Sequence, residues 1–191
     1  VRSLVGSEMC IRDRFRSIPS TLLDNKTFSM FAETPKYRRK ILDRCLMASD
    51  KNFNKDFFSF HRSLKQRNAA LKFKRLTNID MWSEIFINSG TLISEKRNKF
   101  FEETKQTFFM FAKSLNDKRV LEIINSLEIL FHKGWASEQS LKEALEFNRD
   151  TDQRKTSTTS GPHRADIKFL IKDSDIKYCL LYTSDAADEK Y

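Results

Sequence analysis

Glycine, proline and cysteine are all scarce in this chain of 191 residues, which contains 4 glycines, 3 prolines and 3 cysteines. So few turn-forming residues favour helices over a turn-rich β-sandwich. The sequence has no run of about 18 apolar residues, so we expect no transmembrane helix and no membrane partner. The composition therefore predicts a mainly helical protein.

The cysteines exclude two common kinds of stabilisation. Cys10 and Cys179 fall in terminal stretches that are set apart below, which leaves Cys45 on a predicted helix. One thiol forms neither a disulfide framework nor a metal site, and this is consistent with the reducing cytoplasm. We interpret Cys45 as a small buried hydrophobic residue and predict no metal ligands.

No phosphate-binding loop is present either. The pattern G-x-x-x-x-G-K-[ST] does not occur, and no apolar strand ends in the Asp-Glu pair that would hold magnesium and water. Because the binding lysine and the metal carboxylate are missing, we do not expect this chain to bind ATP productively or to hydrolyse it.

Positive charge is what the chain has in excess. The formal net charge is +9 and the isoelectric point is near 9.5. Such a balance favours an acidic partner, such as nucleic acid or an anionic surface, without indicating the fold. The 17 phenylalanines raise the aromatic content to 12%, which is too high for a disordered chain, so we expect a domain with a core.

The stretch from Phe60 to Arg75 concentrates this charge on a helix predicted over 53–76. Residues at helical spacing form two faces of this helix, one apolar and one basic. The apolar face holds Phe53, Phe57, Phe60, Leu64 and Leu71, and the basic face holds Lys55, Arg62, Lys65 and Lys72. A solvated lysine face is the simpler interpretation. Residues 60–75 contain no acidic residue to form i,i+4 ion pairs, which favours contact with a polyanion.

A second basic cluster follows Thr34 and Pro35, which suit the N-cap and the first position of a helix. The first turns carry Lys36, Arg38, Arg39 and Lys40. Positive charge at a helix N-terminus opposes the macrodipole, so we expect a compensating phosphate or acidic side chains nearby. Two interpretations stay open: contact with DNA, or an arginine pair that bridges two lobes.

A long helix is predicted from Met81 to Leu115, after a turn at 77–80. Its apolar positions recur at three- and four-residue steps over roughly 50 Å, and it would form an antiparallel pair with the basic helix. Gly90 in mid-helix costs about 1 kcal/mol against alanine, which a close helix–helix approach would explain. We expect the aromatic cluster at 108–111 to pack against another helix.

The remaining part mixes helix and strand signals. Residues 120–131 fit either a helix or a strand. We expect a short helix at 139–148, a polar linker at 148–160 and an alternating strand at 167–172. Gly161 and Pro162 predict a rigid turn that orients His163 and Arg164, and a lone histidine is more often a structural hydrogen-bonding residue than a catalytic one.

Several motifs, in this order, resemble the RecF family of bacterial recombination mediators, which have an ABC/SMC-type ATPase head. They are TPKYRRKILD (34–43), LKQRNAAL (64–71), a tryptophan-led helix with Trp82, Gly90, Ile93 and Arg97, FHKGW (131–135) and GPHRADIKF (161–169). The resemblance covers about 15–172 and implies a strand at the end of 120–131.

The resemblance implies an α+β, mainly helical fold: the inserted lobe of the ATPase head, with a long antiparallel helical arm and a few edge strands. Residues 15–33 would enter the lobe from the head, 34–119 would form the lobe, and 120–177 would return toward the head. Residues 1–14 and 178–191 resemble translated sequencing-adapter read-through, and we treat them as non-native tails. The chain would then be an internal fragment.

The family resemblance also implies a function, that of an ATP-dependent DNA-binding protein of recombinational repair, replication and the SOS response. Such a protein would bind single-strand/double-strand junctions as an ATP-dependent homodimer in the cytoplasm and, with RecO and RecR, help to load RecA at gaps. ATP and Mg would bind the full-length parent, a weak ATPase. The fragment also lacks the ABC signature, and we expect it to bind no cofactor and to be inactive alone.

These considerations define the predicted sites. The predicted DNA-binding residues are Lys36, Arg38, Arg39, Arg62, Lys65, Arg67 and Lys72, because basic side chains on helices neutralise phosphates. By resemblance, Thr21, His163 and Arg164 would lie near the nucleotide; Thr21 takes the place of the family's Q-loop glutamine and is shorter by two bonds. Two alternatives remain: a helical scaffold that docks the acidic surface of the head, or an unrelated helical RNA-binding module. No catalytic residue is predicted.

Overall fold

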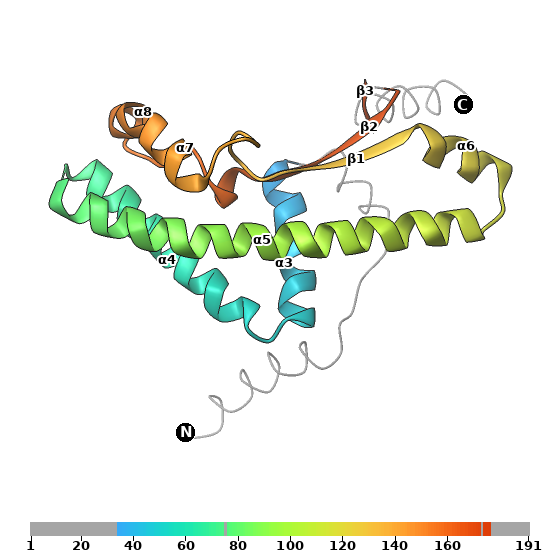
Figure 1. The fold of residues 1–191 in the computed structure, drawn as a ribbon, viewed down its shortest axis with the longest axis horizontal. Helices are drawn as coiled ribbons and strands as arrows, with labels where there is room; N and C mark the ends of the chain where they lie inside the picture. The colour runs from blue at the N-terminus through green and yellow to red at the C-terminus, as the bar shows by residue number, and fades with distance from the viewer. Residues whose placement is uncertain (1–33, 75, 173, 177–191) are drawn as a thin grey trace, which may run out of the picture.

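A computed structural model describes residues 34–74, 76–172 and 174–176 of this chain (Figure 1). The helices are α3 (Pro35–Ser49), α4 (Phe53–Lys72), α5 (Leu76–Ser114), α6 (Lys118–Ser126), α7 (Leu141–Phe147), α8 (Arg149–Lys155) and the short 3-10 helix η2 (Pro162–Arg164). The strands are β1 (Leu127–His132), β2 (Asp166–Ile171) and β3 (Ser174–Asp175). The predicted α+β, mainly helical fold with a long helical arm is confirmed.

Helix α5 is the axis on which the other elements are placed. It contains 39 residues and is therefore roughly 58 Å long. Figure 1 shows α4 on one side of α5 and the β1–β2 ribbon on the other. The predicted turn at 77–80 is wrong, because α5 already begins at Leu76. Ile79 is 5% exposed and packs with Ala70 and Leu71 at the end of α4, so tertiary burial outweighs the polar local sequence.

Helix α4 packs antiparallel along the first half of α5, as predicted. The Phe60 and Phe86 rings lie 5.4 Å apart, and the Ser63 and Ser89 hydroxyl oxygens lie 3.3 Å apart. Residues later in α4 contact residues earlier in α5, since Asp56 pairs with Lys96 and Arg67 reaches Ser83. On each of the two helices the apolar or small side chains recur at three- and four-residue steps. One face of α4 therefore packs against one face of α5.

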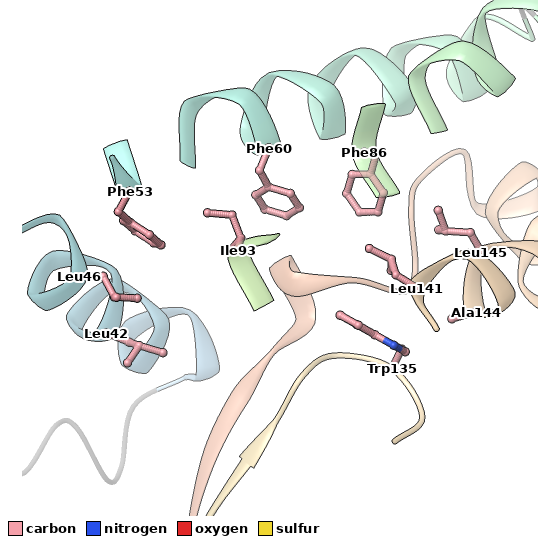
Figure 2. Packing of buried hydrophobic residues seen from close by; sticks show 10 residues of the cluster. All are labelled: Leu42, Leu46, Phe53, Phe60, Phe86, Ile93, Trp135, Leu141, Ala144 and Leu145. Atoms are coloured by element: carbon pink, nitrogen blue, oxygen red, sulfur yellow. The ribbon is translucent and has the colours of Figure 1, made fainter. Parts of the chain in front are cut away.

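The core lies where α3, α4 and α5 meet the loop after β1 and helix α7 (Figure 2). Its buried members are Leu42, Leu46, Phe53, Phe60, Phe86, Ile93, Trp135, Leu141, Ala144 and Leu145. Phe53, Phe60, Phe86 and Ile93 are completely buried. The apolar face predicted for α4 therefore does form the core through Phe53 and Phe60.

Gly90 stands at a close approach, as predicted, although the neighbour is not a second long helix. A Cβ at this position would lie 2.8 Å from Cδ2 of Leu141 and 3.5 Å from Cδ of Pro162. The missing side chain thus lets the first residue of α7 and the turn at Pro162 pack against α5. Mid-helix glycine is tolerated here because this contact offsets its conformational cost.

The chain returns through an antiparallel sheet in the order β1-β2-β3, with Leu127 opposite Ile171 and His132 opposite Asp166. The stretch 120–131 proves to be both predicted states in succession. Helix α6 is capped by the Asp117 carboxylate, which accepts from the backbone N–H groups of Arg119 and Val120. It ends at Ser126, and β1 follows directly.

The polar segment after α7 is not a linker. Helix α7 begins with a capping box between Ser140 and Glu143, and α8 follows over Arg149–Lys155. The linker prediction at 148–160 is therefore wrong over α8. Thr156 ends this helix in the left-handed conformation, with φ of 50°. Local polarity indicated a loop, but a buried contact described below holds the helix against α4.

Two predictions of burial are also wrong. Cys45 is exposed on α3 instead of buried. Near the end of α5, Phe108, Met110 and Phe111 are 42%, 72% and 63% exposed, so the 108–111 cluster does not pack fully against another described helix. No helix in the described ranges is long and apolar enough to cross a membrane.

Candidate nucleic-acid interface

The outward face of α4 carries exposed basic side chains. Arg62, Lys65 and Lys72 are all exposed, and Lys55 extends the same side toward the start of the helix. Positions 62, 65 and 72 follow each other at steps of three and seven, so they lie on one face. This face is opposite Phe53 and Phe60, whose burial fixes the rotation of the helix about its axis.

The acidic residues next to this face are already paired. Lys96 on α5 donates to the carboxylates of Asp50 and Asp56, at 2.8 Å and 2.7 Å. These contacts raise the pKa of Lys96, and the hydrogen bond from Lys96 lowers the pKa of Asp50. Asp56 is the one acidic residue within α4. Its pairing with Lys96 leaves the positive charge of Arg62, Lys65 and Lys72 without compensation from α4 itself.

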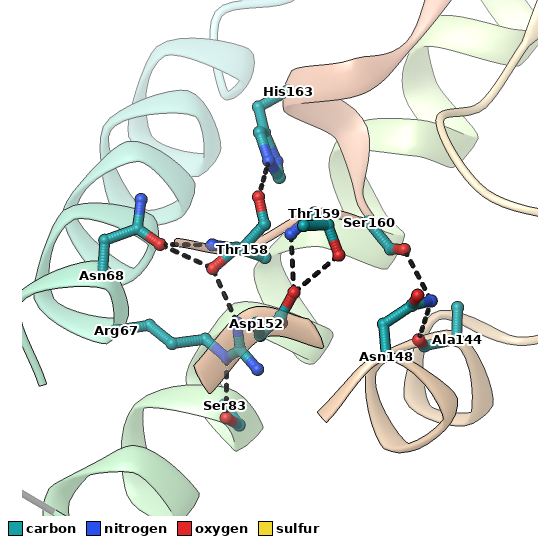
Figure 3. Close-up of polar contacts among 10 residues, drawn as sticks. All are labelled: Arg67, Asn68, Ser83, Ala144, Asn148, Asp152, Thr158, Thr159, Ser160 and His163. Atoms are coloured by element: carbon teal, nitrogen blue, oxygen red, sulfur yellow. Dashed lines mark hydrogen bonds and ion pairs between the residues drawn. The ribbon is translucent and has the colours of Figure 1, made fainter. Parts of the chain in front are cut away.

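Arg67, which we predicted to contact DNA, is buried instead. The residue is 3% exposed, and its NH1 donates to the Asp152 carboxylate at 2.8 Å and to Oγ1 of Thr158 at 2.6 Å (Figure 3). Its Nε donates to Oγ of Ser83 at 2.9 Å. A guanidinium used in this way is not available to a phosphate, so Arg67 is not part of the exposed basic face of α4.

Thr158 is the centre of this polar network. Its backbone N–H and hydroxyl both donate to Oδ1 of Asn68, at 2.8 Å and 2.7 Å, and its carbonyl contacts Nε2 of His163 at 2.9 Å. Asp152 also accepts from the backbone N–H and hydroxyl of Thr159. These bonds fasten the segment after α8 to α4, as Figure 3 shows.

The arginines at the start of α3 hold the strand β2 in place. Arg38 donates to both carboxylate oxygens of Asp166, at 2.8 Å and 3.0 Å, and Arg39 donates to the carbonyl of Ala165 at 2.6 Å. Both side chains are half-buried, and burial together with nearby Arg97 lowers the pKa of Arg39. This arrangement favours the second interpretation of the pair, a bridge between two parts of the fold. Lys36 is exposed.

A further buried ion pair joins α3, α5 and the turn before β2. Arg97, which is 2% exposed, donates through Nε and NH2 to the two oxygens of Asp43 at 2.8 Å and 2.9 Å. Its NH1 donates to the carbonyl of Pro162 at 2.7 Å. Bidentate pairing and a third bond satisfy most of the guanidinium.

The turn at 161–164 forms as predicted. Gly161 has φ of 137°, in the region that favours glycine, and a Cβ there would lie 2.7 Å from Cζ of Phe86. Pro162 begins η2 and is buried. The turn exposes Arg164, whereas His163 points into the polar network of Figure 3. Thr21 lies outside the described residues.

His163 is a neutral structural residue in this setting. The carbonyl of Thr158 can only accept, so Nε2 carries the hydrogen, and Nδ1 is buried without a partner. Burial lowers the pKa of His163 to about 4, and only the bond to Thr158 and the charge of Asp152 oppose this. A neutral imidazole cannot attract an anion by charge, so the predicted anion contact of the turn depends on Arg164.

We expect acid to destabilise the protein through His163. The unfolded chain takes up a proton on this residue near pH 6.5, whereas the folded chain does so only near pH 4. The contribution of neutral His163 to the free energy of unfolding is therefore fully present above about pH 6.5. It falls as the pH drops toward 4, by at most about 3 kcal/mol. The check is urea unfolding at a series of pH values, in which His163→Gln should flatten the curve between pH 6.5 and 4. An equally steep curve for the variant would contradict this origin.

Sequence patterns could not identify the partners of the buried arginines. Asp152 and Thr158 lie in a polar segment with no periodic signal, and Asp43 lies among basic residues of α3. The one available signal was Arg97 itself, a charged residue within the long apolar pattern of α5. Such a position predicts a buried partner without indicating which carboxylate supplies it.

These elements define the class of the molecule: a helical lobe with a small antiparallel sheet, of the kind found in an ABC-type ATPase. Two solved structures that it matches are RecF-ATP and RecF-ATPrS, both of the recombination mediator protein RecF in the RecFOR pathway. In each, the TM-score is 0.66 at 27% identity. The RecF-ATP match covers 82% of this chain and 44% of that chain.

The sequence comparisons agree with this result. No family model matches the chain. A protein named DNA replication and repair protein RecF from Pseudoalteromonas translucida is 35% identical over 165 residues, which is 84% of this chain and 43% of the relative. RecF of Trichlorobacter lovleyi is 28% identical over 144 residues, which is 75% of this chain and 39% of the relative. The chain is therefore homologous to RecF and spans about two fifths of the length of these relatives.

Proposed function

We propose that this chain supplies a DNA-contacting helical lobe to a RecF-like protein. The observation that carries the proposal is the outward face of α4, where Arg62, Lys65 and Lys72 are exposed and the one acid of the helix is paired with Lys96. Cations on such a face neutralise phosphates and release counterions, which gives affinity that depends on salt and little on base sequence. Lys36 at the start of α3 is a further candidate contact.

The activity of the whole protein is proposed from the relatives. It would bind single-strand/double-strand junctions as an ATP-dependent dimer in the cytoplasm and act with RecO and RecR in loading RecA during repair, replication and the SOS response. The names of the solved relatives, which place RecF with ATP in the RecFOR pathway, support this context.

We assign no ATP or Mg site to the residues of this chain. The sequence contains no phosphate-binding loop, and the described residues hold no group of His, Cys, Asp and Glu side chains arranged for a metal ion. Arg164 is the exposed cation of the 161–164 turn and the remaining candidate for a contact with a nucleotide phosphate.

Removing the exposed cations of α4 should strongly weaken DNA binding. We expect the 191-residue chain to bind a junction DNA with steep loss of affinity as salt rises. The variant Arg62→Ala/Lys65→Ala/Lys72→Ala should bind more than about tenfold more weakly, with a salt slope smaller by about 2–3 for duplex contacts. The measurement is fluorescence anisotropy across a salt series.

A matched variant separates the site from net charge. Lys113→Ala/Lys142→Ala/Lys155→Ala removes as many exposed charges from α5, α7 and α8. It should keep both the affinity and the slope within about twofold, because a diffuse field contributes little at physiological salt. Equal losses in the two variants would show that net charge, and not the α4 face, binds DNA.

The second candidate function is a scaffold without DNA contact of its own. The observation that favours it is internal use of Arg38, Arg39 and Arg67, which shows that basic side chains in this fold serve to join its parts. A folded chain that binds no DNA at low salt would support this alternative. Tighter binding of RNA than of junction DNA would instead support an RNA-binding module.

A further inference from the structure

An aromatic side chain stands on the basic face of α4. Phe58 is 65% exposed, in a helix whose other phenylalanines are completely buried (Phe53 and Phe60) or partly buried (Phe57). Positions 58, 62, 65 and 72 are separated by four, three and seven residues, so Phe58 shares a face with Arg62, Lys65 and Lys72. The stripe extends about 21 Å along the helix axis.

The ring of Phe58 is supported from within the fold. It lies 5.9 Å from the ring of Phe57 in an edge-to-face arrangement. Phe57 in turn contacts the rings of His61 at 4.2 Å and Phe53 at 6.0 Å. Aromatic pairs of this kind favour a defined geometry. The exposed ring of Phe58 thus lies against a packed aromatic neighbour, one helical turn from Arg62.

A protein surface for duplex DNA has no evident need of such a ring. In a duplex the bases are stacked on each other, and phosphate contacts need only cations and hydrogen-bond donors. Unpaired bases behave differently, because each offers a π-face that stacks on an aromatic side chain. A basic groove or face with an exposed aromatic ring is the combination that proteins use for single strands.

We propose that the face formed by Phe58, Arg62, Lys65 and Lys72 binds single-stranded nucleic acid, with an unpaired base stacked on Phe58. Arg62 and Lys65 hold the phosphates next to that base, and Lys72 continues the contact toward the end of α4. This inference rests on the proposed function, since it requires that α4 meets nucleic acid. It adds which part of a junction the helix contacts, namely the single strand.

Binding of oligo(dT) and of a matched duplex by the 191-residue chain tests this assignment. Phe58→Ala should weaken oligo(dT) binding about 5- to 100-fold and leave duplex binding within about twofold. Its salt slope should stay unchanged, because no phosphate contact is lost. Phe58→Trp should keep or increase the affinity for oligo(dT), since the larger ring still stacks.

Phe147→Ala is the matched control, because Phe147 is 81% exposed at the end of α7 and lies away from the basic stripe. It should leave the affinity for both DNAs unchanged, and thermal unfolding should show that both alanine variants keep the fold. Unchanged oligo(dT) binding by Phe58→Ala would overturn the stacking assignment, and so would equal losses for oligo(dT) and duplex.

The same experiment distinguishes this inference from the proposed function. If Arg62→Ala/Lys65→Ala/Lys72→Ala loses oligo(dT) and Phe58→Ala does not, the stacking role is wrong and α4 still binds DNA. If the unchanged protein binds neither DNA at low salt, the proposed function fails and the stacking role with it. In that case the exposed ring and its cations form a protein-docking face.

Discussion

Replacing Arg97 with alanine is expected to lower the free energy of unfolding by about 3–5 kcal/mol. Arg97 is 2% exposed and pairs bidentately with Asp43, which is itself 7% exposed, so the variant leaves a carboxylate buried without its counter-ion. It also removes the donor to the carbonyl of Pro162, which holds the turn before β2 against α5. Urea unfolding followed by circular dichroism measures the change.

Two comparisons isolate the buried charge. Arg164→Ala removes an exposed arginine of the neighbouring turn and should stay within about 0.5 kcal/mol of the unchanged protein. The double variant Arg97→Met/Asp43→Leu replaces the pair by apolar side chains and should recover most of the lost stability. A loss below about 1 kcal/mol for Arg97→Ala would show that the pair is solvated or loosely packed.

Replacing Asp152 with alanine is expected to have an effect of similar size, about 3–5 kcal/mol. Asp152 is completely buried and accepts from Arg67 and from the backbone N–H and hydroxyl of Thr159. Its loss would strand the Arg67 guanidinium inside the fold with only Thr158 and Ser83 as acceptors. The variant should therefore weaken the contact between α4 and the segment after α8.

The neighbouring acid of α8 provides the control. Asp150 is exposed in the same helix, and Asp150→Ala should change stability by no more than about 0.5 kcal/mol. If residues 148–160 were the polar linker that their composition suggests, Asp152→Ala would be equally mild. Hydrogen exchange of α8 amides gives a second readout, because loosening of this contact should lower their protection before the core of α5 opens.

The role of Arg67 follows from the same network. We predicted Arg67 as a DNA-contacting cation because it is a basic side chain on this helix, but its burial predicts a loss of stability and not of a phosphate contact. Arg62, one turn and a half earlier, is exposed and should behave in the opposite way. The two arginines thus separate structural from binding effects within a single helix.

Helical periodicity in the sequence was enough to predict α4 and α5 and their antiparallel packing. The reason is that three- and four-residue spacing is a local property, and one apolar face per helix requires a partner. Gly161 and Pro162 likewise predicted their turn, because the allowed backbone angles of these residues are intrinsic. Local signals failed at α8 and at 77–80, where contacts with α4 outweigh polar composition.

The sequence by itself thus determined the helical arm, the turn, the basic charge and the homology to RecF. Only the tertiary structure decided which cations remain exposed. Asp152 lies 85 residues from Arg67, and Asp166 lies 128 residues from Arg38, so no local pattern reveals either pair. A buried guanidinium must find a carboxylate, and the fold alone brings the two together. Arg62, Lys65 and Lys72, by contrast, are exposed on α4 beside Phe58.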